Sequence, residues 1–182
     1  MIVKEGPASH SPFKLESLLT RLQSIDENIT GLGARFIHLI DSKEELNQKQ
    51  DEVLESILEY GPNWPFGIND GFKIFILPRF GTTSPWSSKA TDIAKVCGLV
   101  SINKIERGIA FTLALNDKDL IPSREAIELL YDRMTEVFIT DLRQAEEMFS
   151  SLKPKPFSEI DILSDDKTAL ETANLELGLA LN

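Results

Sequence analysis

The chain has 182 residues, of which 42% are apolar and 26% charged, and its 19 basic and 29 acidic side chains give a formal net charge of −10. This composition is typical of a folded soluble domain. The sequence contains no run of about eighteen apolar residues, which is the length needed to cross a membrane. Because the negative charge repels polyanions and no basic stripe interrupts it, we expect neither nucleic acid nor a membrane as a partner.

The cysteine and histidine content bounds the chemistry further. Cys97 is the only cysteine, so it cannot form an internal disulfide, and the first residues, Met1 to Pro7, lack the basic-then-apolar pattern of a signal peptide. Both facts favour the cytoplasm. His10 and His38 have no further ligand types at metal-binding spacing, so no metal site is predicted, and His38 is interpreted as a core residue.

The first third of the chain predicts a helix followed by a strand. Ser11-Pro12 is a typical N-cap with proline at the first helical position, and leucines then repeat on one face up to about Ser24. Gly31 and Gly33 are expected to break the chain. The apolar run 35–40 without helical spacing indicates a strand buried on both faces.

The middle of the chain predicts a second helix and two strands. Ser42–Glu45 has the pattern of a capping box, and the helix behind it should end at Gly61-Pro62. The expected buried face of that helix consists of Leu46, Val53, Leu54, Ile57 and Leu58. Apolar runs over 72–77 and 102–115 predict strands, with Gly108 as a bulge in the second.

A third, long helix of about seven turns is predicted to begin at Pro122-Ser123 and to run to Phe149. Its expected stripe is Ile127, Leu130, Tyr131, Met134, Val137, Phe138, Leu142, Ala145 and Phe149. Lys153–Pro156 cannot continue a helix, which predicts a domain boundary between 1–152 and 153–182. A last amphipathic helix carries Leu170, Ala173, Leu177 and Leu181. The whole is an α+β protein.

The stretch from Pro78 to Ala94 has two interpretations. In the structural one, Ser84 is an N-cap, Pro85 is the first helical residue, and one apolar stripe is closed by Gly98. That stripe is Trp86, Ala90, Ile93, Ala94 and Cys97. The functional interpretation notes that a helix N-terminus beside several hydroxyls, Arg79 and Lys89 suits a phosphate. The spacing of a nucleotide-binding loop is absent, so both interpretations stay open.

Four separated strings carry a resemblance to a known family: "PRFGTTSPWSSKATDIAKVCGL", "INKIERGIAF", "LYDRMTE" and "ALETANLELGLAL". In this order they resemble the amino-terminal region of the large, single-chain phosphoribosylformylglycinamidine synthase of purine biosynthesis. The resemblance covers nearly the whole chain. It implies a small-subunit-like α/β unit that is a fused pair, or pseudo-dimer, followed by a linker domain that begins near Phe157.

The resemblance also implies what this chain lacks. The family's synthetase part, which uses ATP and Mg²⁺, and its glutaminase part lie further along the enzyme, so this chain is expected to be a non-catalytic amino-terminal fragment with those parts as partners. A glutaminase needs a Cys activated by a positioned His. Cys97 lies on a stripe predicted to be buried, where a thiol is usually inert, and we therefore predict no catalytic residue.

Seven residues are candidates for contact with the catalytic body or with a phosphate: Arg79, Thr83, Ser84, Ser87, Ser88, Lys89 and Arg107. Glu106-Arg107 and Asp132-Arg133 are interpreted as salt bridges that fix strand and helix in preference to substrate contacts. Two hypotheses remain. The first is a scaffolding and interface domain of the amidotransferase, and the second is an independent acidic module that binds a small phosphorylated ligand at Ser84–Lys89.

Overall fold

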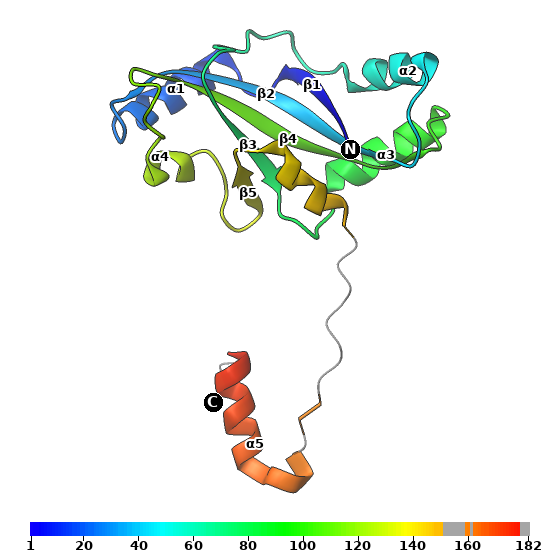
Figure 1. Cartoon of the computed structure of the whole chain (residues 1–182), viewed down its shortest axis with the longest axis vertical. Helices are drawn as coiled ribbons and strands as arrows, with labels where there is room; N and C mark the ends of the chain where they lie inside the picture. Colours follow the sequence, from blue (N-terminus) through cyan, green and yellow to red (C-terminus); the bar gives the residue numbers. More distant parts are fainter. Residues whose placement is uncertain (151–158, 161, 179–182) are drawn as a thin grey trace. The chain divides into compact units, whose positions relative to one another are not determined.

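The computed structural model describes residues 1–150, 159–160 and 162–178. The chain divides into two compact units, Met1–Ser151 and Leu152–Asn182, which are considered separately (Figure 1). The predicted boundary motif Lys153–Pro156 and the predicted apolar residue Leu181 lie outside the described residues.

The first unit is an α+β fold built on one five-stranded antiparallel sheet, as the α+β expectation requires. Its elements are β1 (Ile2–Ala8), α1 (Pro12–Gln23), β2 (Ile29–Ser42), α2 (Gln48–Leu58), β3 (Phe72–Pro78), α3 (Pro85–Val96), β4 (Ile102–Leu115), α4 (Arg124–Glu128), β5 (Glu136–Ile139) and the 3₁₀ helix η1 (Leu142–Phe149). The strand order is β1-β2-β4-β3-β5. The long strands β2 and β4 therefore form the centre, and β1 and β5 form the edges.

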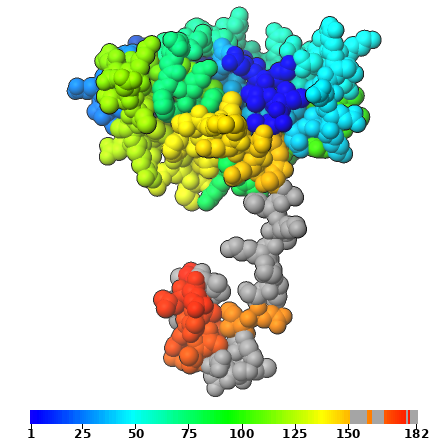
Figure 2. All heavy atoms as spheres, in the orientation of Figure 1, coloured from blue at the N-terminus to red at the C-terminus, as the bar shows by residue number. Residues whose placement is uncertain are grey.

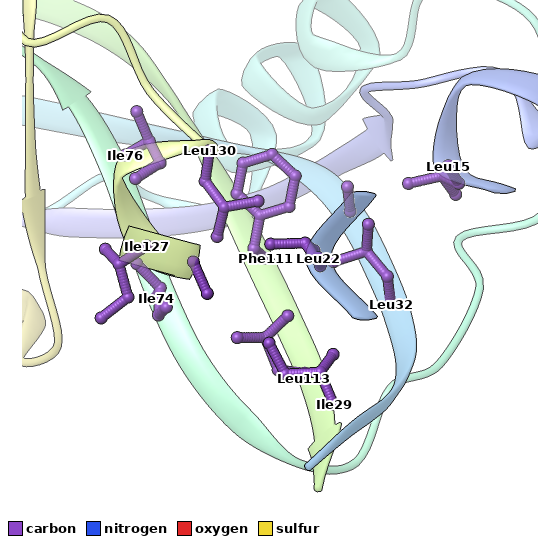
Figure 3. Close-up of a cluster of buried hydrophobic side chains, with 12 residues drawn as sticks. Leu15, Leu22, Ile29, Leu32, Ile74, Ile76, Phe111, Leu113, Ile127 and Leu130 are labelled. Atoms are coloured by element: carbon purple, nitrogen blue, oxygen red, sulfur yellow. The ribbon is translucent and has the colours of Figure 1, made fainter. Parts of the chain in front are cut away.

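The four α-helices cover one face of the sheet, which we call the helical face. α1 and α4 lie at one end of it and α2 and α3 at the other (Figure 1). At the first end, Leu22 and Leu130 pack around the fully buried Phe111 of β4 (Figure 3). At the other end, Leu54 of α2 and Ala94 of α3 belong to one buried cluster. Burial of these apolar side chains is the main stabilising contribution to the unit.

The opposite face of the sheet is packed by η1. Ala145 and Met148 of η1 belong to the same buried cluster as Ile37 of β2 and Phe75 of β3. Alternate residues of each strand thus serve the two faces, as the two-residue period of a strand requires. Figure 2 shows η1 in amber and the edge strand β1 in dark blue at the surface of the first unit.

Two halves of the first unit have matching dimensions. α1 and α3 each have 12 residues, and β2 and β4 each have 14. Both pairs are offset by the same number of positions, since 85 − 12 and 102 − 29 are both 73. Phe36 pairs with Ile109 across the two central strands, and these two residues are also 73 positions apart. The pair Phe36–Ile109 therefore has the same offset as the two matched helices and the two matched strands.

The predicted long third helix is wrong. The segment instead forms the short α4, a turn, the edge strand β5 and η1. In the turn, the Asp132 carboxylate accepts a hydrogen bond of 2.8 Å from the backbone N–H of Met134, and the N–H of Asp132 donates to Glu136. β5 then pairs with β3, and this non-local pairing overrides the helical spacing of the apolar residues.

Glycines explain two further differences. Gly31 and Gly33 do not break the chain, because β2 begins at Ile29 and contains both. A side chain at Gly33 would clash with the carbonyl oxygen of Ile68, which lies in the loop between α2 and β3. Glycine at this position of β2 therefore allows that loop to lie close against the strand. Gly108 forms no bulge with β2, since it pairs in register with Ile37.

The start of the second helix also differs from the prediction. The capping box is Asn47 with Gln50, not Ser42 with Glu45, and α2 begins at Gln48. Ser42 instead ends β2, and its hydroxyl donates to the carbonyl of Glu44.

The second unit contains α5 (Ile162–Leu177), so a helix lies where the last amphipathic helix is predicted. Ala173 is buried, whereas Leu170 is 39% exposed and Leu175 is 85% exposed. An ion pair of 3.2 Å joins Lys167 and Glu171 one turn apart. Across the described parts of both units, no helix is long and apolar enough to span a membrane.

Candidate functional site

The start of α3 is locked to β4 through Ser84 and Glu106. Ser84 is the N-cap, as predicted, and its hydroxyl accepts from the N–H of Ser87 at 3.0 Å. The same hydroxyl donates to the Glu106 carboxylate at 2.6 Å, and Glu106 is fully buried. The Lys104 ammonium lies 3.6 Å from this carboxylate. A negative charge at a helix N-terminus is stabilised by the helix dipole, so the arrangement fixes α3 on the sheet.

The buried face of α3 is polar as well as apolar. It consists of Ser87, Ala90, Thr91 and Ala94. The Ser87 hydroxyl donates to the carbonyl of Ile105 at 2.6 Å, and the Thr91 hydroxyl accepts from the N–H of the same residue at 2.9 Å. Two side chains of α3 thus satisfy both backbone groups of one residue of β4. Ser87 therefore cannot contact a neighbouring domain, which corrects its assignment as a surface candidate.

The predicted apolar stripe of α3 is rotated by about one residue from the observed buried face. Trp86 is only half-buried, Ile93 is 44% exposed, and Cys97 is exposed. The expectation that Cys97 is buried is therefore wrong. Both histidines of the chain, by contrast, are buried, so neither stands at the surface as a base for this thiol.

Four of the candidate residues do lie at the surface. Arg79, Thr83, Ser88 and Lys89 are all exposed. Arg79 lies against the turn before β5, because its backbone N–H donates to Thr135 at 3.0 Å and its guanidinium donates to the Met134 carbonyl at 3.4 Å. Arg79 and Thr83 precede α3, and Ser88 and Lys89 are its fourth and fifth residues. We call these four exposed residues the exposed edge of the helix start.

Arg107 is held by aromatic rings. Its guanidinium carbon lies 4.2 Å from the ring centre of Phe36, 4.7 Å from Trp86 and 5.8 Å from Tyr60. It also donates to the Tyr60 hydroxyl at 3.3 Å. Among the described residues, the Arg107 guanidinium forms no ion pair with a carboxylate within 4 Å, although the backbone N–H of Arg107 donates to Glu106 at 3.1 Å. Cation–π contacts thus replace the predicted salt bridge of Arg107, whereas Arg133 does pair, with Glu128 at 3.5 Å.

His38 completes the aromatic cluster beneath Arg107. Its ring stacks on Trp86 with centres 5.6 Å apart, and its Nε2 shares a hydrogen bond of 2.8 Å with the Tyr60 hydroxyl. Burial, and then the charge of Arg107, lowers the pKa of His38 to about 4, so the ring is neutral. The interpretation of His38 as a core residue is confirmed. The contribution of Tyr60 had no sequence signal, because it follows α2 by two residues in an irregular segment.

Comparison with protein families matches residues 35–149, well over half of the chain, to the family described as formylglycinamide ribonucleotide amidotransferase N-terminal. The chain belongs to this family. The match confirms the resemblance to this family and contains the first three of the four sequence strings, whereas the fourth, residues 169–181, lies outside the matched range. It covers α3, β4 and the aromatic cluster around Arg107, and so the family assignment applies to the elements that build the candidate site.

Proposed function

We propose that the chain is the non-catalytic, scaffolding amino-terminal part of formylglycinamide ribonucleotide amidotransferase. The complete enzyme makes formylglycinamidine ribonucleotide from formylglycinamide ribonucleotide, glutamine and ATP in purine biosynthesis. The observation that carries the proposal is the family match over residues 35–149. In this proposal ATP and Mg²⁺ bind the synthetase part, and the synthetase and glutaminase parts are the partners of this chain in the cytoplasm.

The chemistry of the α3–β4 region supports a structural role. The polar groups of Ser84, Ser87, Thr91 and Glu106 are engaged with one another or with the backbone of β4. Groups used in this way hold elements together and are not free to bind a reacting molecule. The exposed edge formed by Arg79, Thr83, Ser88 and Lys89 then remains as the surface for the catalytic body.

A phosphorylated ligand at Ser84–Lys89 is the alternative, and the position of Glu106 disfavours it. The buried carboxylate accepts hydrogen bonds from both the hydroxyl and the N–H of Ser84, at 2.6 and 3.4 Å. The negative charge of Glu106 would repel an anion at the same helix start. The hydroxyl and N–H of Ser84 are also not free to donate to such an anion, because both donate to Glu106.

We infer further that the first unit is a fused pair of small-subunit-like halves. The equal lengths of α1 and α3 and of β2 and β4, their common offset of 73 positions and the central pair Phe36–Ile109 support this relation. Ser11 and Ser84 cap the two matched helices, and each is followed by proline at the first helical position. We also propose that 153–182 begins the linker domain, so that limited digestion near Lys153 or Lys155 with a protease of broad specificity, such as proteinase K, releases an intact first unit.

Reconstitution tests the proposed function. The isolated chain is expected to hydrolyse neither glutamine nor ATP. Mixed with the remainder of the enzyme expressed separately, it should restore glutamine-dependent amidation of formylglycinamide ribonucleotide. Turnover of glutamine or ATP by the chain alone would contradict the proposal, and so would full activity of the remainder without it.

A further inference from the structure

A small cavity of about 220 Å³ opens on the helical face between the two groups of helices. Its floor consists of side chains from four adjacent strands and its wall comes from the start of α3. The lining residues used below are Phe36, Ile76, Trp86, Arg107, Ile109 and Glu136. At about 30 Å³ for each water, the space equals roughly seven water molecules, which suits a small organic molecule and not a nucleotide.

Two opposite charges line this cavity without pairing. Arg107 donates to Tyr60, and Glu136 accepts from the N–H of Asp132 at 2.8 Å. Within the part of the chain that the structure describes, neither side chain has an oppositely charged partner within 4 Å. Because neither charge has an ionic partner in that part of the chain, the two are available to pair with the complementary charges of a ligand.

The register fixes the spacing of these charges. Arg107 is on β4 and Glu136 is on β5, and β3 lies between them in the sheet. Glu136 pairs with Pro78 of β3, which lines the cavity as well. Strands are about 4.8 Å apart, so the two backbones are separated by about 10 Å, and the side chains converge across that gap from the same face. A molecule of a few atoms with both charges can bridge them.

The start of α3 contributes a wall but no anion site. The Ser84 hydroxyl is engaged with Glu106 and with the N–H of Ser87. The charge that attracts an anion into this cavity is therefore that of the Arg107 guanidinium, whose planar fork suits a carboxylate. Glu136 at the same cavity repels a dianion such as phosphate and attracts an ammonium group.

We propose that this cavity binds a free α-amino acid. The carboxylate of the amino acid pairs with Arg107, its ammonium group pairs with Glu136, and its side chain packs against Phe36, Ile76 and Ile109. This site goes beyond the scaffolding function and does not depend on it, because every group that forms it lies in the described first unit.

Titration of the full chain tests the proposal through the fluorescence of Trp86, which lines the cavity. A Trp64→Phe background removes the other tryptophan. L-Glutamine and L-leucine should each give a saturable change. Acetate, which offers only the anion, and n-butylamine, which offers only the cation, should bind at least about tenfold more weakly, because each lacks one charge-assisted contact. Inorganic phosphate should give no saturable change.

Two glutamate variants separate the site from a general effect of charge. Glu136→Gln keeps an acceptor for the Asp132 N–H and should weaken amino-acid binding about tenfold without weakening acetate binding. Glu146→Gln makes the same change at an exposed residue of η1 and should leave the affinities for the amino acids and for acetate unchanged. Equal melting temperatures confirm that the variants are folded. No saturable change with either amino acid, tighter binding of phosphate, or unchanged amino-acid affinity in Glu136→Gln would each overturn the proposal.

Discussion

The Ser84 hydroxyl lies 2.6 Å from the Glu106 carboxylate, so one hydrogen bond joins the N-cap of α3 to β4. Glu106 is fully buried, and its further contacts are the Arg107 N–H at 3.1 Å, the Ser84 N–H at 3.4 Å and the Lys104 ammonium at 3.6 Å. Removal of this carboxylate would leave the groups that make these four contacts without their partner inside the fold, and such a loss is costly.

Replacement of Glu106 should therefore destabilise the first unit strongly. We expect Glu106→Ala to lower the free energy of unfolding by roughly 3 kcal/mol. The unfolding free energy of Glu106→Gln should lie between those of Glu106→Ala and the parent, because its amide oxygen still accepts hydrogen bonds. Thermal unfolding measures this as a shift of about 2–4 °C for each kcal/mol. Glu147→Ala on the exposed side of η1 is the control and should stay within about 0.5 kcal/mol. Equal shifts for Glu106→Ala and Glu147→Ala would show that the buried carboxylate contributes nothing.

Ser87 and Ser88 offer a comparison between adjacent residues of one type. Ser87 is fully buried and donates to Ile105, whereas Ser88 is exposed. Ser87→Ala leaves the Ile105 carbonyl without this donor and should cost about 1–3 kcal/mol, while Ser88→Ala should cost less than about 0.5 kcal/mol. Urea denaturation distinguishes these values. A larger loss for Ser88→Ala would mean that the orientation of α3 described above is wrong.

The same helix shows what could be predicted from the sequence. Its N-cap, its first proline and its end near Gly98 are local signals, and each is confirmed. Its buried face could not be predicted from apolar spacing, because Ser87 and Thr91 are buried through hydrogen bonds to Ile105, a partner that only the fold supplies. The aromatic cluster around Arg107 likewise joins residues from four distant segments, and no spacing along the chain relates them.

The region after β4 could not be predicted from the sequence either. Its apolar residues have a helical spacing, but the structure places them partly in β5, which pairs with β3 so that Phe75 lies opposite Ile139. A local sequence pattern carries no information about backbone pairing with a strand about sixty positions away. Strands 72–77 and 102–115 were, by contrast, predictable, because the first is a short run rich in Phe and Ile and the second alternates apolar residues over Ile109–Leu115.

Two glycines with similar backbones should respond differently to alanine. Gly67 has φ 80° and Gly98 has φ 89°, so both substitutions carry the cost of a left-handed backbone, about 1–2 kcal/mol. A side chain at Gly67 would also clash with the Leu32 carbonyl, whereas the space around Gly98 is open. Gly67→Ala should therefore lower the free energy of unfolding by at least about twice as much as Gly98→Ala. Equal losses in urea denaturation would contradict the close approach of the loop to β2.

The two buried histidines predict how stability depends on pH. Burial lowers the pKa of both His10 and His38 from 6.5 to about 4. Because the unfolded chain binds these protons at a higher pH than the folded one, stability is complete above pH 6.5 and falls as the pH drops toward 4. Each histidine should remove about 2 kcal/mol of unfolding free energy between pH 7 and pH 5.

Histidine substitution isolates this effect from that of the carboxylates. In His38→Gln, whose amide can still bond to Tyr60, the loss between pH 7 and pH 5 should be smaller by about 2 kcal/mol than in the parent chain. Urea denaturation at the two pH values gives the difference. An unchanged loss would show that His38 titrates normally in the folded chain.

The role of the exposed edge around the start of α3 is tested most directly by reconstitution with altered cations. Arg79→Ala and Lys89→Ala should leave the melting temperature nearly unchanged, since truncation of an exposed cation costs within about 0.5 kcal/mol. The measured quantity is the concentration of chain that restores half of the amidation activity of the separately expressed remainder. Each variant should raise this concentration by about fivefold or more, which corresponds to roughly 1 kcal/mol of lost binding free energy. Lys49→Ala on the exposed surface of α2 is the matched control and should behave as the parent chain does. We expect this separation between stability and reconstitution, and full reconstitution by both cation variants at the parent's concentration would contradict the proposed role of the exposed edge.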